Sequence, residues 1–224
     1  CPVVVEYIRK YSPDHVRFIT PIISPMLAHA KILKQLYGED VKIVFAGPCI
    51  CKKLEADYFN NLVDVVITFK DLKKWFEQSD INLKNIAPNQ PEARFVPYRS
   101  GMGAYYPIEG GMLKGMQEGK KQIHHMAFSE LSTVKDVLKE LDSHRENDSI
   151  FLELLACKGG CINGPAKLSH ISPALKRYEI IHQSELGNPK DDFKNIDLQI
   201  LFCKDPHVQD HTYTEEEIKQ AMAV

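Results

Sequence analysis

The sequence ELLACKGGCING, at residues 153–164, decides the fold and the chemistry expected of this chain. It continues an almost unbroken apolar run from Ile150 to Ala156, which is typical of a strand buried on both faces. The glycine pair between Cys157 and Cys161 permits a tight turn and a close approach of the backbone to a ligand. In open α/β sheets, ligands gather at the carboxyl ends of strands, where Cys157 is expected. The pattern predicts a metal site; the alternative is two buried cysteines around a turn.

Cys1 and Cys49 are the other two candidate metal ligands. Apolar residues recur at helical spacing from Pro2 to Tyr11, so Cys1 is expected at a helix N-terminus, which stabilises a thiolate. Residues 41–46 form an apolar strand that runs almost directly into Cys49. The four thiols have the spacing C-x47-C-x107-C-x3-C. Four thiolates suit a cubane iron-sulfur cluster or a structural zinc, and zinc is the weaker alternative because it normally takes two closely spaced pairs.

Strands and helices alternate along the chain, which predicts an α/β fold with largely parallel or mixed sheets flanked by helices. Helices are expected at residues 2–11, 26–37, 71–76 and 133–141 and shortly after Lys52, and strands at residues 41–46, 63–68, 126–128, 150–156 and 198–203. The proline-bearing stretch at about 82–97 is expected to connect a lobe of about residues 1–85 to one of about residues 98–224. The metal site would lie in the cleft between these lobes. The glycine- and methionine-rich segment from Gly101 to Gly119 allows no clear prediction of secondary structure.

Composition restricts the class of protein. The chain has 224 residues, 44% of them hydrophobic and 26% charged, with a formal net charge of −2, so neither nucleic acid nor an anionic membrane is an expected partner. No apolar run is long enough to cross a bilayer and no signal peptide is recognisable, so a soluble cytoplasmic domain is expected. Because the chain starts at Cys1 and ends in a helix-capping pattern at Thr214 and Glu217, we expect a single domain excised from a longer protein.

Several further side chains have two interpretations each. Cys51 is either a fifth thiol at the site or, preferably, a small buried neighbour of it, and Cys203 is expected to be an inert core thiol. Lys52 is either a solvated surface charge or a donor to an anionic cluster. Glu153, inside an apolar strand, is either paired in the core, which we favour, or part of a proton route. The pair His124-His125 is expected at a partly solvated strand edge rather than in a site.

Three motifs resemble, in order, those of the catalytic H-cluster domain of [FeFe]-hydrogenases, over nearly the full chain. Cys1-Pro2 resembles the end of that family's Cys-Cys-Pro motif, and PCICKKLE at residues 48–55 resembles its Pro-Cys-x-x-Lys-x-x-Glu motif. Residues 153–164 resemble the third motif. Ser24-Pro25 and Gly110-Gly111 resemble two weaker shared elements.

The resemblance implies a cofactor and roles for individual residues. Cys1, Cys49, Cys157 and Cys161 would hold a [4Fe-4S] cluster, and Cys161 would also bridge to a two-iron subsite bearing CO, cyanide and a dithiolate. Lys52 would hydrogen-bond a cyanide, so Lys52 and Cys161 would take part in splitting or forming H2. The cofactor would also be lined by Ser24, Pro48, Gly159 and Gly160. An upstream ferredoxin-type domain would deliver electrons.

Several positions depart from the pattern that the resemblance implies. Met26 replaces a glutamine that contacts a diatomic ligand, and a thioether cannot donate a hydrogen bond. Gly47 and Leu155 replace methionines, Lys158 a proline and Val4 an aromatic residue. These departures resemble the sensory branch of the family, in which a PAS-type signalling module follows and turnover of H2 is slow or absent. The alternatives are an active hydrogenase and a hydrogenase-like iron-sulfur assembly factor that lacks the two-iron subsite.

Overall fold

The computed structural model describes residues 1–59, 61–86, 100–116, 123–141 and 149–185, which fall into two compact units. Unit 1 contains Cys1–Ile23, Met102–Cys161 and Leu201–Val224, and unit 2 contains Ser24–Gly101 and Ile162–Ile200. This grouping differs from the consecutive lobes expected from the sequence, because the N-terminal helix groups with the strand before Cys157 and the chain re-enters unit 2 after Cys161. The expectation of an α/β fold with largely parallel sheets flanked by helices is confirmed, and each described sheet is a parallel pair of strands.

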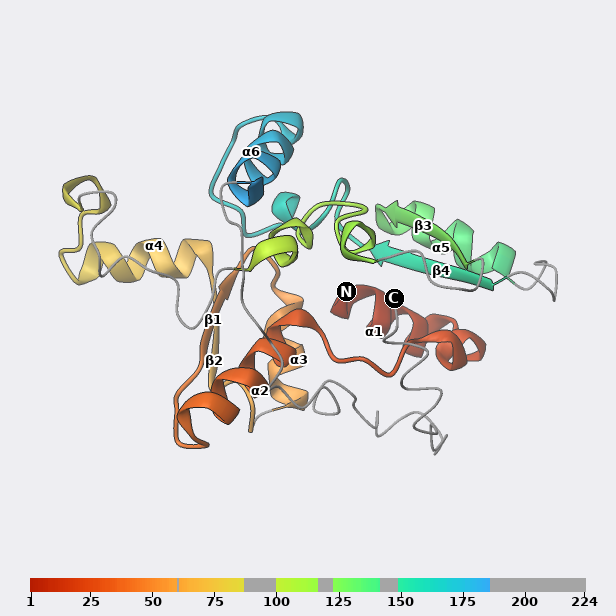
Figure 1. The fold of residues 1–224 in the computed structure, drawn as a ribbon, viewed down its shortest axis with the longest axis horizontal. Coiled ribbons are helices and arrows are strands. Elements are labelled where there is room, and N and C mark those ends of the chain that lie inside the picture. Colours follow the sequence, from red (N-terminus) through yellow and green to blue (C-terminus); the bar gives the residue numbers. More distant parts are fainter. Residues whose placement is uncertain (60, 87–99, 117–122, 142–148, 186–224) are drawn as a thin grey trace. The chain divides into compact units, whose positions relative to one another are not determined.

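Unit 1 is organised around one parallel pair of strands, β3 (Ile123–Ser129) and β4 (Ser149–Leu155), with α5 (Leu131–Glu140) between them in the chain (Figure 1). The helix α1 (Pro2–Tyr11) has the bounds that its apolar spacing predicts, and Pro2 occupies its first turn. Val4 and Ile8 of α1 form a hydrophobic cluster with Val134 and Leu138 of α5. This cluster fixes α1 within unit 1.

Short 3-10 helices complete the described part of unit 1. They cover Pro13–Phe18, Gly101–Tyr105, Leu113–Gly115 and Cys161–Asn163, two of them extending one or two residues beyond the unit. The glycine- and methionine-rich segment, whose structure could not be predicted, is therefore built largely of tight turns in its described part.

Unit 2 contains a second parallel pair, β1 (Val44–Gly47) and β2 (Val65–Thr68). Its described helices are α2 (Pro25–Tyr37), α3 (Cys51–Tyr58), α4 (Phe69–Gln78) and α6 (Pro173–Glu185). A 3-10 helix, Leu83–Asn85, follows α4. Gly38 ends α2 with a φ of 97°, as the sequence predicts. Both strands are shorter than the apolar runs that predicted them.

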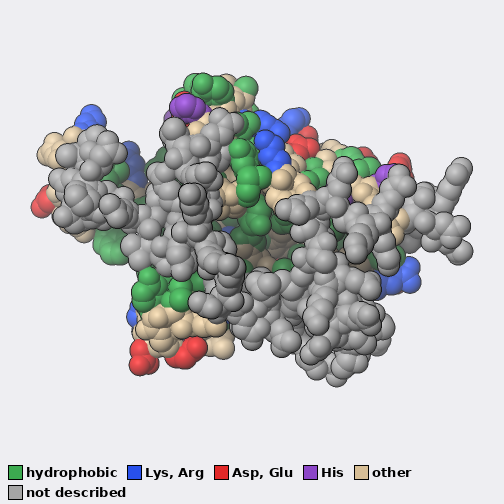
Figure 2. All heavy atoms as spheres, viewed as in Figure 1, with side chains coloured by type: hydrophobic (Ala, Val, Ile, Leu, Met, Phe, Trp, Pro, Cys, Tyr) green, Lys and Arg blue, Asp and Glu red, His purple; other side chains and the backbone are tan. Residues whose placement is uncertain are grey.

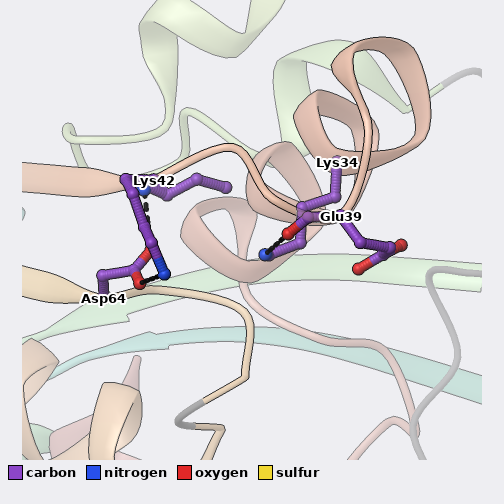
Figure 3. Close-up of polar contacts among 5 residues, drawn as sticks. Lys34, Glu39, Lys42 and Asp64 are labelled. Carbon is purple, nitrogen blue, oxygen red and sulfur yellow. Dashed lines mark hydrogen bonds and ion pairs between the residues drawn. The ribbon is translucent and has the colours of Figure 1, made fainter.

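A carboxylate fixes the start of the β1–β2 pair (Figure 3). Asp64 accepts hydrogen bonds from the Ile43 backbone N–H at 2.8 Å and from Lys42 Nζ at 3.1 Å. These contacts, with the Ile43 N–H first, hold the pKa of Asp64 below its ordinary value. Lys34 Nζ, also drawn in Figure 3, donates to the carbonyl oxygen of Glu39 at 2.8 Å. Through its hydrogen bonds to Lys42 and to the Ile43 N–H, Asp64 supports the register that pairs Val44 with Val65.

A capping box starts α4 and yields the first prediction. Thr68 Oγ1 accepts from the Asp71 N–H at 3.1 Å, and Asp71 Oδ2 accepts from the Thr68 N–H at 2.8 Å. We expect Thr68→Ala to lower the free energy of unfolding by about 1 kcal/mol, because one N–H of the first turn loses its acceptor. Urea unfolding measures this loss. The exposed Thr20 provides the control, and a Thr68→Ala loss no larger than that of Thr20→Ala would contradict the cap.

The helix α6 was not predicted from the sequence. Its apolar residues do not form one buried face: Leu175 is 45% exposed and Tyr178 is 60% exposed, while Lys176 is buried. Figure 2 shows hydrophobic side chains on the surface at this helix, at the top of the view. The expected strand at 198–203 and the helix expected from Thr214 lie outside the described residues.

The described helices are short. The longest are α2 and α6, with 13 residues each. No helix in the described ranges is both long enough and apolar enough to span a membrane.

Candidate metal centre

The turn between Cys157 and Cys161 lies at the carboxyl end of β4, as predicted. The strand ends at Leu155, and the Gly160 N–H donates to the Cys157 carbonyl oxygen at 2.9 Å to close the turn. Gly159 and Gly160 have φ values of 73° and 105°, in the region that favours glycine. Both thiols are partly buried. The turn therefore has the tight backbone that the glycine pair indicated.

Cys1 lies at the N-terminus of α1, also as predicted. It packs, together with Ala156, against the cluster formed by Val4, Ile8, Val134 and Leu138. Unit 1 thus gathers Cys1 and the residue before Cys157 around one hydrophobic cluster.

Residues 107–113, which we call the buttress segment, pack directly against the cysteine turn. A Cβ atom on Gly160 would lie 2.7 Å from Ile108 Cα and 2.8 Å from Glu109 N, and still closer to the Pro107 carbonyl oxygen. The backbone of the buttress segment thus occupies the space that any side chain at position 160 would need. Gly160 is required by this close approach as well as by its φ.

Glu153 holds the same segment from β4. Its carboxylate accepts from the backbone N–H groups of Gly110 at 3.1 Å, Met112 at 3.2 Å and Leu113 at 3.4 Å, and Glu153 is only 4% exposed. Burial raises the pKa of Glu153, and the three N–H donors oppose that shift. The structure confirms that Glu153 is paired in the core.

Unit 2 places Cys49 between β1 and α3, and the third residue after it, Lys52, forms an ion pair. Lys52 Nζ donates to Ser24 Oγ at 2.9 Å and to Glu55 Oε2 at 2.5 Å, and the Lys52 and Glu55 side chains are each 13% exposed. Ser24 precedes α2 and Glu55 follows Lys52 by one turn of α3. Lys52 is therefore a largely buried, fixed cation three residues after Cys49, whereas the adjacent Lys53 is 49% exposed.

The neighbours of Cys49 are also fixed. The Pro48 carbonyl oxygen accepts from the Ala166 N–H at 3.0 Å, so the segment that follows Cys161 in unit 2 is tied to the residue before Cys49. Cys51 is the first residue of α3 and is partly buried, and its role beside the site stays a prediction.

The departures from the expected pattern have structural counterparts. Met26 is buried, at 6% exposure, in the first turn of α2. A Cβ atom on Gly47 would lie 2.7 Å from the Phe45 ring, so this ring covers the place of a larger side chain at position 47. Leu155 is buried at the end of β4. These three positions present apolar groups and no side-chain hydrogen-bond donor.

The four candidate ligands are divided between the units. Cys1, Cys157 and Cys161 belong to unit 1 and Cys49 belongs to unit 2. Among the described residues, no three His, Cys, Asp or Glu side chains gather in a metal-binding arrangement. The convergence of the four cysteines stays a prediction, as does the cleft. Their chemistry fits an iron-sulfur cluster, since all four are partly buried thiols at the ends of strands or helices. Cys203 lies outside the described residues.

Three polar residues at the cysteine turn or paired with Lys52 were not predicted to have a role. Ser129 and Glu109 contact the cysteine turn, and Glu55 pairs with Lys52. The spacing of three between Lys52 and Glu55 on a helix was a usable signal. A charged residue just before Gly110-Gly111 was a weaker one. His124 is exposed and His125 is partly exposed on β3, where the sequence indicated a partly solvated strand edge.

Residues 1–165 match the family described as the iron only hydrogenase large subunit, C-terminal domain. The chain belongs to this family. The match includes every one of the four candidate cysteines, together with Lys52 and Glu153. The expected resemblance to the H-cluster domain is thus confirmed at the level of the family, and the sensory branch stays a prediction.

The relatives of this chain carry names that describe more than one function. Iron hydrogenase 1 of Clostridium pasteurianum is 24% identical over 93% of this chain and 42% of its own length. The cytosolic Fe-S cluster assembly factor narfl of Danio rerio is 25% identical over 88% of this chain and 62% of its own. The chain spans about half the length of these relatives.

Solved structures show the same fold. An [FeFe]-hydrogenase whose structure is described as revealing stepwise H-cluster assembly has a TM-score of 0.56 at 19% identity. The match covers 81% of this chain and 64% of that chain. The [FeFe]-hydrogenase of Chlamydomonas reinhardtii has a TM-score of 0.57 at 17% identity, with the same coverage. At this level of identity, the likeness establishes the fold of the hydrogenase domain and leaves its chemistry to other arguments.

Proposed function

We propose that this domain binds a [4Fe-4S] cluster through Cys1, Cys49, Cys157 and Cys161 and acts in sensing H2 or redox state, with slow or no turnover of H2. The observation that carries the proposal is Lys52, fixed by Ser24 and Glu55 three residues after Cys49. An ammonium has three N–H donors, and these two partners engage two of them, which leaves one for an anionic ligand. A fixed cation beside a ligand thiol also stabilises an anionic cluster.

Lys52 supports a second component as well. A two-iron subsite, when bound, would supply the binding and splitting of H2, and Cys161 would connect it to the cluster. The third N–H of Lys52 would hold a cyanide ligand of that subsite. Gly159 and Gly160 would bring the backbone close to the cofactor, and Pro48 and Ser24 would lie at its border.

The apolar groups at Met26 and Leu155 and the Phe45 ring over Gly47 favour sensing over fast catalysis. Hydrogen bonds and packing around a metal centre tune its reactivity, and these positions contribute no donor. A sensor needs binding and a change of state, and it tolerates the loss of rapid turnover. Such a cytoplasmic sensor would take electrons from an upstream ferredoxin-type domain and signal through a downstream PAS-type module.

Anaerobic reconstitution tests the proposal. The full-length protein is supplied with iron and sulfide and then with a synthetic two-iron cofactor, and infrared bands are recorded under H2 and under argon, with H2 evolution. We expect about four irons and four sulfides per chain before the second step, as a cubane cluster requires, bands that change under H2, and little H2 evolution. Stoichiometric zinc without acid-labile sulfide would contradict the cluster, and turnover equal to that of a dedicated hydrogenase would contradict sensing.

Two adjacent lysines give a matched pair for the role of Lys52. Lys52→Met is expected to abolish the infrared bands of the two-iron cofactor while four irons remain bound. Lys53→Met removes an exposed charge from the same turn and should leave the bands unchanged. Equal effects of the two substitutions would contradict a specific role for Lys52.

The assembly-factor function is the second candidate, and the similarity to the Danio rerio factor favours it. In that case the four-iron cluster forms, the two-iron cofactor does not bind, and Lys52→Met has no effect on the spectrum of the loaded protein.

A further inference from the structure

We propose that Glu109 is a positioning residue that, through Ser129, fixes Gly159 in the Cys157–Cys161 turn and withholds the Gly159 N–H from a cluster bound there. The inference rests on the proposed [4Fe-4S] function and goes beyond it by naming a determinant of the cluster's reduction potential. The residues that form it lie in unit 1, so it does not depend on how the two units are placed.

Glu109, Ser129 and Gly159 form a closed ring of hydrogen bonds. The Ser129 hydroxyl donates to Glu109 Oε2 at 2.6 Å and accepts from the Gly159 N–H at 2.9 Å. The Glu109 backbone N–H donates to the Gly159 carbonyl oxygen at 3.4 Å, which closes the ring. The ring therefore binds Gly159, the middle residue of Cys-x3-Cys, on both its N–H and its carbonyl.

The carboxylate determines the direction of the hydrogen bonds in this ring. An ionised carboxylate accepts only, and a serine hydroxyl carries one proton. The Ser129 proton must therefore point at Glu109, which leaves an oxygen lone pair for the Gly159 N–H. Because its acceptor is charged, this hydroxyl bond is of the short and strong kind. Without Glu109, the Ser129 side chain loses the acceptor that fixes it, so it can turn about its Cα–Cβ bond and release the Gly159 N–H.

The buttress segment gives the ring a rigid base. Glu153, four residues before Cys157, holds this segment through the N–H groups of Gly110, Met112 and Leu113. The ring holds it to Gly159, two residues after Cys157. The same segment therefore supports the chain on both sides of Cys157, and a change at Glu109 reaches a ligand thiol through a short and well-packed path.

The ring should lower the potential of a cluster in this turn. Hydrogen bonds to cluster sulfurs and the net charge nearby set the potential, and both donors and positive charge favour the reduced state. The ring removes one N–H from the donors that the turn offers and places a carboxylate beside it. Glu109→Gln removes the charge and loosens the ring, and Ser129→Ala frees the Gly159 N–H. Both substitutions should raise the potential.

The test is a redox titration of the reconstituted four-iron cluster in the full chain, followed by electron paramagnetic resonance. We expect Glu109→Gln and Ser129→Ala each to raise the reduction potential, and the double variant to shift it by less than the sum of the two single shifts. Ser129→Thr keeps the hydroxyl and should have the wild-type potential. Glu130→Gln is the control, because Glu130 reaches the same turn through the exposed side chain of Lys158, at 2.9 Å. An unchanged potential in both single variants, or an equal shift in Glu130→Gln, would overturn the proposal.

A second measurement needs no cluster. In the metal-free protein, iodoacetamide labelling of Cys157 is read from its peptide mass, and we expect the labelling rate to rise about fivefold in Glu109→Gln and Ser129→Ala, the equivalent of about one lost hydrogen bond. Unchanged labelling would overturn the positioning role, as would a lower melting temperature with normal labelling and potential. Failure of the wild-type chain to take up iron would refute the proposed function alone, because the labelling result still decides the role of the ring.

Discussion

Gly160→Ala is expected to lower the free energy of unfolding by about 4 kcal/mol and to abolish cluster uptake. The new Cβ atom would lie 2.7 Å from Ile108 Cα and 2.8 Å from Glu109 N, and closer still to the Pro107 carbonyl oxygen. These are backbone atoms, which cannot turn away as the end of a side chain can. Glu153 and the Glu109–Ser129–Gly159 ring hold the buttress segment in place, so the cysteine turn itself must move.

Gly38→Ala provides the matched control. Gly38 has a φ of 97°, close to the 105° of Gly160, but no atom lies within 4 Å of the position that a Cβ atom would take there. We expect this variant to lose only about 2 kcal/mol, the cost of the backbone conformation, and to bind iron normally. Urea unfolding and iron and sulfide analysis measure both variants. Equal losses of stability with equal iron content would show that the buttress segment does not press on the turn.

Glu153→Ala is expected to lower the free energy of unfolding by about 3 kcal/mol. Its carboxylate accepts three backbone N–H groups in a buried place, and alanine would leave these donors without an acceptor. Glu153→Gln should lose less, because its amide oxygen can still accept, although its NH2 group would face an N–H. Glu77→Ala, which breaks an exposed pair with Lys73, should stay within about 0.5 kcal/mol of the wild type. A Glu153→Ala loss no larger than that of Glu77→Ala would contradict the role of the carboxylate.

The pKa of Glu153 gives this comparison a pH dependence. Burial raises the folded-state pKa above the unfolded value, so the folded chain binds the Glu153 proton more tightly than the unfolded chain does. The contribution of this titration to stability is therefore fully present below the unfolded pKa and is lost as pH rises through the folded pKa. Glutamine does not titrate, so the stability advantage of the wild type over Glu153→Gln should shrink as pH rises from the unfolded-state pKa of Glu153 through its raised folded-state pKa. An advantage that grows over this range would contradict the raised pKa. The titration of Asp64 changes stability in the opposite direction. Its folded-state pKa is lowered, so its contribution to stability is lost as pH falls through the folded-state pKa.

The sequence by itself determined the local features of both halves of the candidate centre. The bounds of α1 and the end of α2 at Gly38 followed from apolar spacing, Pro2 and a single glycine, which act within a few residues. The position of Cys157 at the end of β4 followed from an apolar run and two glycines. The family itself was recognisable from three short motifs, because a thiolate ligand and its turn are encoded in neighbouring residues.

Only the tertiary structure decided what holds these motifs in place. Ser129 lies 30 residues before Gly159 and 20 after Glu109, and Glu153 lies 43 residues after Gly110, so no local pattern relates them. The buttress segment has no periodic apolar face, because its shape comes from the Glu153 carboxylate that binds its N–H groups and from Gly160, which lets its backbone approach the cysteine turn. The grouping of α1 with α5 likewise depends on hydrophobic contacts between segments far apart in the chain. Hydrophobic burial and hydrogen bonding depend on which segments meet in the folded chain. The sequence shows that an apolar or polar side chain needs a partner, but it does not show which distant residue that partner is.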